Sequence, residues 1–176
     1  MASRSLTLLL SLVLAAIACV GYAADGRQTW VFSSIYGHER TLSRDVSGDY
    51  SISVVDVTAV VDDCDDGSYR VCFSSRYLAA AIPTEQPEKG SRWIVGPSTF
   101  SVLTIVEEAK VLGYDVRDLY VIDVERKPVP PIDIVAHSFR LFFSYSDGLI
   151  GFGEIEDDTE PVFYFASNLP SLGAKE

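Results

Sequence analysis

The chain is poor in the residues that most catalytic and metal sites require. It contains three cysteines, two histidines and one methionine among 176 residues. It has no Gly-x-Ser-x-Gly element, and no glycine-rich phosphate or dinucleotide loop stands before a predicted helix. Zinc sites of clustered Cys and His are therefore excluded, and the sequence predicts no cofactor and no metal.

Cations are also scarce relative to carboxylates. The chain has 25 Asp and Glu residues against 14 Lys and Arg residues, which gives a formal net charge of −11. Such a chain repels nucleic-acid phosphates, so no nucleic-acid partner is predicted. The negative charge favours a basic protein as partner, and it also helps to keep an exported protein soluble.

The N-terminus has the three parts of a secretory signal. Arg4 precedes the apolar run Leu6–Val20, and the small residues Gly21 and Ala23 follow. The run is shorter than the roughly 20 residues of a membrane-spanning helix. We therefore predict a cleavable signal peptide over residues 1–23. The mature chain is expected outside the cytoplasm, periplasmic or secreted, with no membrane span after cleavage.

Two alternatives for this leader remain open. The stretch Ala16-Ile17-Ala18-Cys19 resembles a bacterial lipobox, although Ala16 stands where Leu is expected. Lipidation of Cys19 would anchor the protein to a membrane. A leader that is not cleaved would instead act as the anchor itself.

The two remaining cysteines are predicted to form a disulfide, Cys64–Cys72. An even pair is the expected pattern in an oxidising compartment. The turn-forming residues Asp65–Ser68 separate two β-rich runs, so a hairpin loop centred near Ser68 would place the two cysteines opposite each other. A tight turn at residues 66–67 would pair Cys64 with Tyr69 instead, so the bridge requires a wider loop or a bulge.

One segment has the spacing of an amphipathic helix. Apolar residues recur at helical intervals between Val102 and Leu112, Ser98 or Thr99 can cap the start, and Gly113 suits a left-handed C-terminal position. The rest of the chain favours strands. The clearest are residues 30–36, 50–61, 93–95, 119–124 and 161–166, together with a hairpin over residues 139–152.

These patterns predict the α+β class. We expect a single domain over residues 24–176, with a mainly antiparallel sheet and one principal helix (about 98–112) packed on one face. The tail after Asn168 is expected to be frayed.

Two acidic clusters are candidate partner surfaces. The first consists of Asp62, Asp63, Asp65 and Asp66, and the second of Glu154, Glu156, Asp157, Asp158 and Glu160. Counted from Asp62, an EF-hand would need ligands at its third and twelfth positions, which are Cys64 and Phe73. The clusters are therefore read either as solvated turns or as surfaces that steer a basic protein.

The lack of a catalytic constellation favours a non-catalytic binding or accessory envelope protein. A first alternative is an envelope hydrolase that pairs His38 or His137 with a carboxylate. In a strand, however, His137 and its neighbour Ser138 would point to opposite faces.

A second alternative is an inhibitor of a basic enzyme. The stretch Ser47-Gly48-Asp49-Tyr50 resembles, over four residues, the Ser-Gly-x-x-Tyr loop of bacterial periplasmic lysozyme inhibitors, and it is one residue shorter. The resemblance implies a polar or acidic loop that enters the cleft of a basic enzyme such as a lysozyme.

Overall fold

The computed structural model describes residues 26–47, 49–54, 57–63, 67–75, 78–127, 138–155 and 160–174. In these residues it contains twelve strands and no helix. The predicted α+β class is therefore wrong, and the described chain is all-β. The strands are β1 (Gln28–Ser34), β2 (Glu39–Arg44), β3 (Tyr50–Val54), β4 (Val57–Asp63), β5 (Tyr69–Ser74), β6 (Ala79–Pro83), β7 (Arg92–Val95), β8 (Ser98–Val111), β9 (Tyr114–Arg126), β10 (Ser138–Ser144), β11 (Gly148–Glu154) and β12 (Val162–Ala166).

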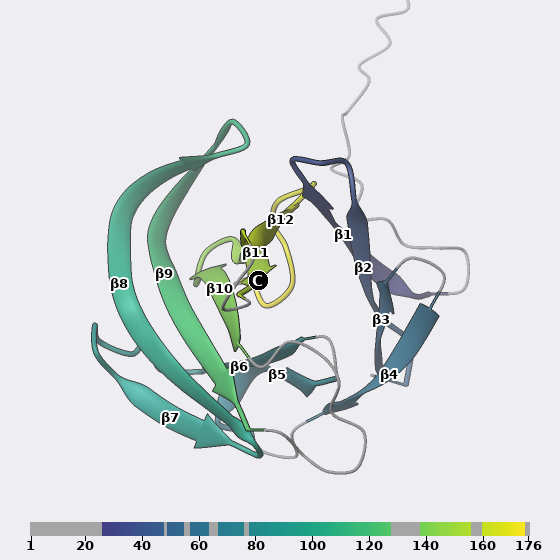
Figure 1. Ribbon diagram of the computed structural model, residues 1–176, viewed down its shortest axis with the longest axis horizontal. Coiled ribbons are helices and arrows are strands. Elements are labelled where there is room, and N and C mark those ends of the chain that lie inside the picture. The colour runs from purple at the N-terminus through teal and green to yellow at the C-terminus, as the bar shows by residue number, and fades with distance from the viewer. Residues whose placement is uncertain are drawn as a thin grey trace, which may run out of the picture.

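The strands form one antiparallel sheet that curls around a common interior (Figure 1). Its order is β6-β5-β4-β3-β2-β1-β12-β11-β10-β9-β8-β7, so nearly every strand pairs with its neighbour in sequence. The exception is the pairing of β1 with β12, which brings the two ends of the described chain together. The edge strands β6 and β7 also meet, because the Trp93 indole N–H donates a 2.9 Å hydrogen bond to the Ala81 carbonyl.

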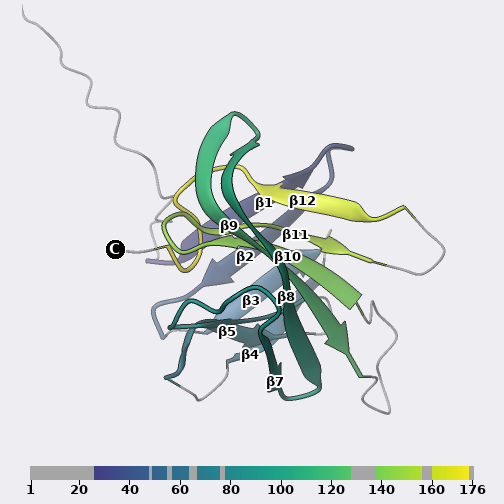
Figure 2. The same ribbon diagram turned by 90° about the vertical axis from the view of Figure 1, so that its left-hand side faces the viewer.

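The predicted helix is the strand β8, one arm of the long hairpin β8–β9, which curves along the left of Figure 1 and faces the viewer in Figure 2. A shift in register skips Leu103 and marks a β-bulge. Before it, Phe100 and Val102 point into the core, and after it Ile105 packs against the core. The bulge thus changes a spacing of two into one of three, which imitates the helical pattern.

Gly113 has the left-handed backbone that its position predicted, but in a different structure. Leu112 and Gly113 have φ angles of 47° and 90°, and they connect Val111 to its pairing partner Tyr114. Two successive residues with positive φ are typical of a type I′ turn, which matches the twist of a hairpin. The residue that was expected to end a helix therefore closes the β8–β9 hairpin.

The core lies on the inner face of the curled sheet. Its largest fully buried side chains include Phe32, Phe100, Phe139, Phe143 and Phe152. A second, smaller cluster of Val116, Leu119 and Ile150 packs separately, with Phe142 and Leu169 against it. No helix in the described ranges is long and apolar enough to cross a membrane.

Candidate functional site

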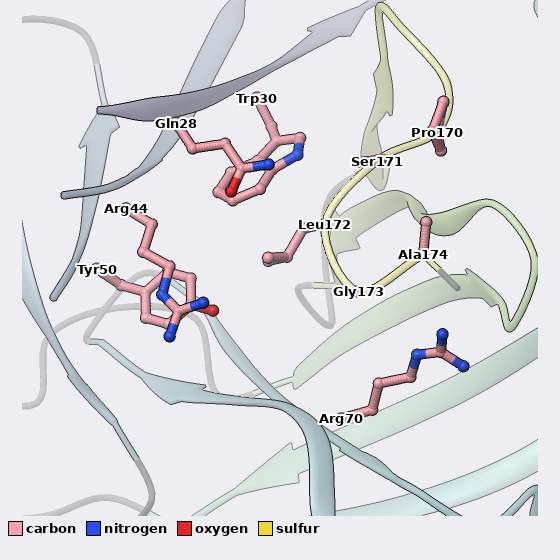
Figure 3. A pocket seen from close by; sticks show the side chains of 10 residues that line it. All are labelled: Gln28, Trp30, Arg44, Tyr50, Arg70, Pro170, Ser171, Leu172, Gly173 and Ala174. Atoms are coloured by element: carbon pink, nitrogen blue, oxygen red, sulfur yellow. The ribbon is translucent and has the colours of Figure 1, made fainter. Parts of the chain in front are cut away.

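A cavity of roughly 440 Å³ lies at one end of the strands (Figure 3). It is bounded by strands β1, β2, β3 and β5 and by the segment that follows β12. Its lining residues are Gln28, Trp30, Arg44, Tyr50, Arg70, Pro170, Ser171, Leu172, Gly173 and Ala174.

Strand register builds the first wall of this cavity. Gln28 pairs with Arg44, and Arg44 pairs with Tyr50, so the three side chains form a row on one face of β1, β2 and β3. Residues directly opposite in an antiparallel sheet share a face. The next row inward begins with Trp30, which is 9% exposed and belongs to the core. The wall therefore passes from a polar rim to an apolar floor.

Arg70 comes from β5, across the cavity from this row, and its position is set by a bulge. Tyr69 pairs with Pro83 and Val71 pairs with Ile82, with a break in register between them at Arg70. A bulge leaves one residue without a partner in the ladder and redirects its side chain. Val71 remains buried in the core while Arg70 lines the cavity.

The C-terminal segment forms the remaining wall. The Ser171 N–H donates to the Asp147 carbonyl at 2.7 Å, and the Leu149 N–H donates to the Leu172 carbonyl at 2.8 Å. Leu172 is 4% exposed, and its side chain projects into the space beside Trp30 (Figure 3). Gly148, with a φ of 86°, allows this approach, because a Cβ there would lie 2.5 Å from the Ser171 carbonyl oxygen.

The lining is rich in hydrogen-bond donors. It contains two guanidinium groups, an amide, two hydroxyls and an indole, and none of the lining residues that the structure describes is a carboxylate. The guanidinium carbon of Arg44 lies 5.2 Å from the centre of the Tyr50 ring. The hydroxyl of Ser171 is buried and has no hydrogen-bond partner in the described part of the chain.

Arg70 is held against a second tyrosine. Its guanidinium carbon lies 5.6 Å from the centre of the Tyr145 ring. The Tyr145 hydroxyl donates to the carbonyls of Pro83 (2.9 Å) and Glu85 (3.2 Å). Burial, and to a lesser extent the neighbouring Tyr120, raise the pKa of Tyr145 strongly, so this hydroxyl stays protonated.

The predicted acidic surfaces are described only in part. Asp62 and Asp63 are on β4, Glu154 ends β11 partly buried, and Glu160 is exposed before β12. Asp65, Asp66, Glu156, Asp157 and Asp158 lie outside the described residues. Glu154 and Glu160 are the members whose side chains the structure describes, and neither is among the described lining residues of the cavity.

Of the three cysteines, the structure describes Cys72 alone. Cys72 is buried on β5 and disulfide-bonded. Cys64, Cys19 and the whole predicted signal peptide lie outside the described residues. Asp63, the residue before Cys64, pairs with Phe73, the residue after Cys72. The Cys64–Cys72 pairing remains a prediction that this register favours.

The two histidines are not assembled into a described catalytic site. His38 is exposed in the turn between β1 and β2, where its backbone N–H donates to the Ser34 hydroxyl at 3.1 Å. His137 lies outside the described residues. Over the described ranges no group of three or more His, Cys, Asp or Glu residues could hold a metal ion.

The turn between β2 and β3, part of the predicted inhibitor loop, is organised by one carboxylate. The Asp45 Oδ1 atom accepts hydrogen bonds from the Ser47 N–H (2.9 Å), the Ser47 hydroxyl (2.9 Å) and the Asp49 N–H (3.0 Å). This arrangement is typical of an Asx turn. Gly48 lies outside the described residues, and the inhibitor hypothesis stays a prediction.

Sequence reasoning missed the cavity. One signal was present in β1, where Gln28 alternates with Trp30 and Phe32 and must therefore share the core face. No local signal pointed to Arg70, because its orientation depends on the pairing of β5 with β6.

No family model matches the chain, and neither a curated protein nor a solved structure matches it.

Proposed function

We propose that the protein is an exported, non-catalytic binding protein that holds a small molecule in the cavity between the Gln28–Tyr50 row and the C-terminal segment. The cavity itself carries this proposal. Its volume of roughly 440 Å³ falls within the range of about 300–1,000 Å³ that is usual for small-molecule sites.

The construction of the walls supports the proposal. Trp30 and Leu172 supply apolar surface at the bottom, and polar groups such as Gln28 and Arg44 surround the opening. Ligand sites commonly combine an apolar lining with a few placed polar groups. Most of the wall consists of strands of one hydrogen-bonded sheet, and the C-terminal segment is hydrogen-bonded to Asp147 and Leu149, so the cavity exists before the ligand arrives.

The chemistry of the lining favours binding over turnover. Guanidinium groups, an amide and an indole hold a ligand well, but none of them is a nucleophile with an adjacent base. The described lining residues include no imidazole and no carboxylate that could serve as a base for a hydroxyl nucleophile.

Native mass spectrometry of the mature protein, purified without denaturation from envelope extract, tests this function. We expect the added mass of a small molecule, which is lost on denaturation. Ala174→Trp would fill the cavity and remove the adduct. Ile94→Trp, at a position 71% exposed on β7, would retain it. An adduct that survives Ala174→Trp, or turnover of a substrate by the purified protein, would contradict the proposal.

A further inference from the structure

We infer that the ligand of this cavity is a small organic anion, whose charged oxygens bind at Arg70 and whose apolar body lies between Trp30 and Leu172. The inference rests on the proposed function, because it names the ligand class of the same cavity. Its evidence is the charge, the donors and the shape of the described lining.

The charge of the cavity differs from that of the chain. The protein has a formal net charge of −11, but the charged side chains among the described lining residues are Arg44 and Arg70. An arginine side chain offers N–H donors and no acceptor, and its planar fork fits the oxygens of a carboxylate, sulfonate or phosphate. The lining therefore selects acceptors that carry negative charge.

Arg70 is the best-placed anchor. Its guanidinium carbon lies over the Tyr145 ring, 5.6 Å from the ring centre. Stacking of this kind leaves the N–H groups at the edge of the guanidinium able to bind an oxyanion. No residue in the described ranges forms an ion pair with Arg70, so a bound anion would not have to displace a carboxylate from it.

A second donor lies on the same wall. The Ser171 hydroxyl is buried and lacks a hydrogen-bond partner among the described residues, although buried hydroxyls are normally paired. In Figure 3 the Arg70 side chain lies below Ala174, near the end of the C-terminal segment that also carries Ser171. Both residues line the cavity, so a guanidinium and a hydroxyl are candidate donors for an oxyanion bound there.

The opposite side of the cavity fits an apolar body. Trp30 is 9% exposed and lies across from Leu172, which projects toward it (Figure 3). A flat or branched hydrocarbon group placed against these two residues would remove its own apolar surface from water. The cavity therefore matches an amphipathic anion better than a bare inorganic ion.

The test compares two probes that differ in one group. The aromatic sulfonate 8-anilinonaphthalene-1-sulfonate is the anion, and N-phenyl-1-naphthylamine is the same skeleton without the sulfonate. We expect the mature wild-type protein to bind the sulfonate about ten- to a hundredfold more tightly, as a charge-assisted hydrogen bond provides. This advantage should decrease as salt is raised, because the cavity is open to solvent.

Two variants with the same change in net charge locate the anion. Arg70→Met should remove the preference for the sulfonate. Arg92→Met should keep it, since Arg92 is on β7 and lies 3.8 Å from Glu125, outside the cavity. If Arg70→Met does not fold, Arg70→Lys keeps a cation without the fork and should retain only part of the preference.

The outcomes separate the inference from the proposed function. Equal binding of the two probes, or a preference that Arg70→Met leaves intact, would overturn the anion site while the cavity remained a ligand site. Failure of both probes to bind would contradict the anion site and would also count against the cavity as a ligand site.

Discussion

The guanidinium of Arg70 lies over the ring of Tyr145, with 5.6 Å between the guanidinium carbon and the ring centre. The tyrosine hydroxyl is in turn fixed by the carbonyls of Pro83 and Glu85. Strand β5, the turn after β10 and the end of β6 are thus joined through one aromatic side chain. This connection holds the cation at the cavity wall.

Tyr145→Phe should separate stability from binding. The variant keeps the ring beneath Arg70 but leaves two carbonyls without their donor, so we expect a loss of about 1–2 kcal/mol in the free energy of unfolding. Urea denaturation measures this loss. Affinity for the anionic probe should stay close to that of the wild type. A drop as large as that of Arg70→Met would show that the ring alone does not position the guanidinium.

Alkaline pH should destabilise the protein through its buried tyrosines. Burial raises the pKa of Tyr120, Tyr145 and Tyr164 above the usual value of 10.0. Above about pH 10 the unfolded chain loses these phenolic protons while the folded chain keeps them. The folded state then binds more protons, so the free energy of unfolding decreases as pH rises, by at most about 1.4 kcal/mol per pH unit for each tyrosine.

Urea denaturation from about pH 8 to about pH 11 would measure this effect. Tyr145→Phe is the matched variant, because it removes one of the three phenols and should reduce the slope. A free energy of unfolding that stays constant across this range would show that the three hydroxyls ionise equally in both states.

Gly148→Ala should loosen the C-terminal wall. The added Cβ would lie 2.5 Å from the Ser171 carbonyl oxygen and 2.6 Å from that of Leu172, at a φ of 86°. We expect a loss above about 2 kcal/mol in stability and weaker binding of either probe. Gly37→Ala is the control, since it has a similar φ of 79° but nothing within 4 Å of the added Cβ. Equal losses in the two variants would mean that the wall adapts without cost.

Thiol counting tests the leader and the disulfide on one sample. If cleavage follows Ala23 and Cys64 pairs with Cys72, the denatured mature protein should show no thiol before reduction and two afterwards. Reduction should lower stability by about 2–3 kcal/mol, as expected for a short closed loop. A third thiol, present before and after reduction, would show an uncleaved leader with an unmodified Cys19. A lipidated Cys19 carries a thioether and adds no thiol, so mass spectrometry of the N-terminus would identify it by the mass of the lipid.

Local patterns predicted some parts of the fold better than others. The hairpin around Ser146–Gly148 is present as β10 and β11, because turn residues between β-rich runs act locally. The class was wrong, because the bulge at Leu103 gave β8 the spacing of a helix. A bulge depends on the partner strand, and residues 98–112 alone do not reveal it.

The site was harder to predict than the strands, for a related reason. Arg70 on β5 faces the cavity because of a bulge in its pairing with β6. The row of Gln28, Arg44 and Tyr50 spans three strands, and the last wall is the segment after Asn168. The residues after Asn168 show no regular alternation of polar and apolar side chains, and this tail was expected to be frayed. The cavity is assembled by long-range contacts, which include the pairing of β1 with β12 and the hydrogen bonds of Ser171 and Leu172 to residues 147 and 149.

The fluorescence of Trp30 provides the most direct measurement. The chain has two tryptophans, so Trp93→Phe leaves Trp30 as the single indole, at the cavity floor. We predict that 8-anilinonaphthalene-1-sulfonate quenches the fluorescence of Trp30 saturably in this variant. Adding Arg70→Met should raise the probe concentration that gives half-maximal quenching about tenfold or more. Saturable binding of the probe without any change in Trp30 fluorescence would place the ligand elsewhere and contradict the account.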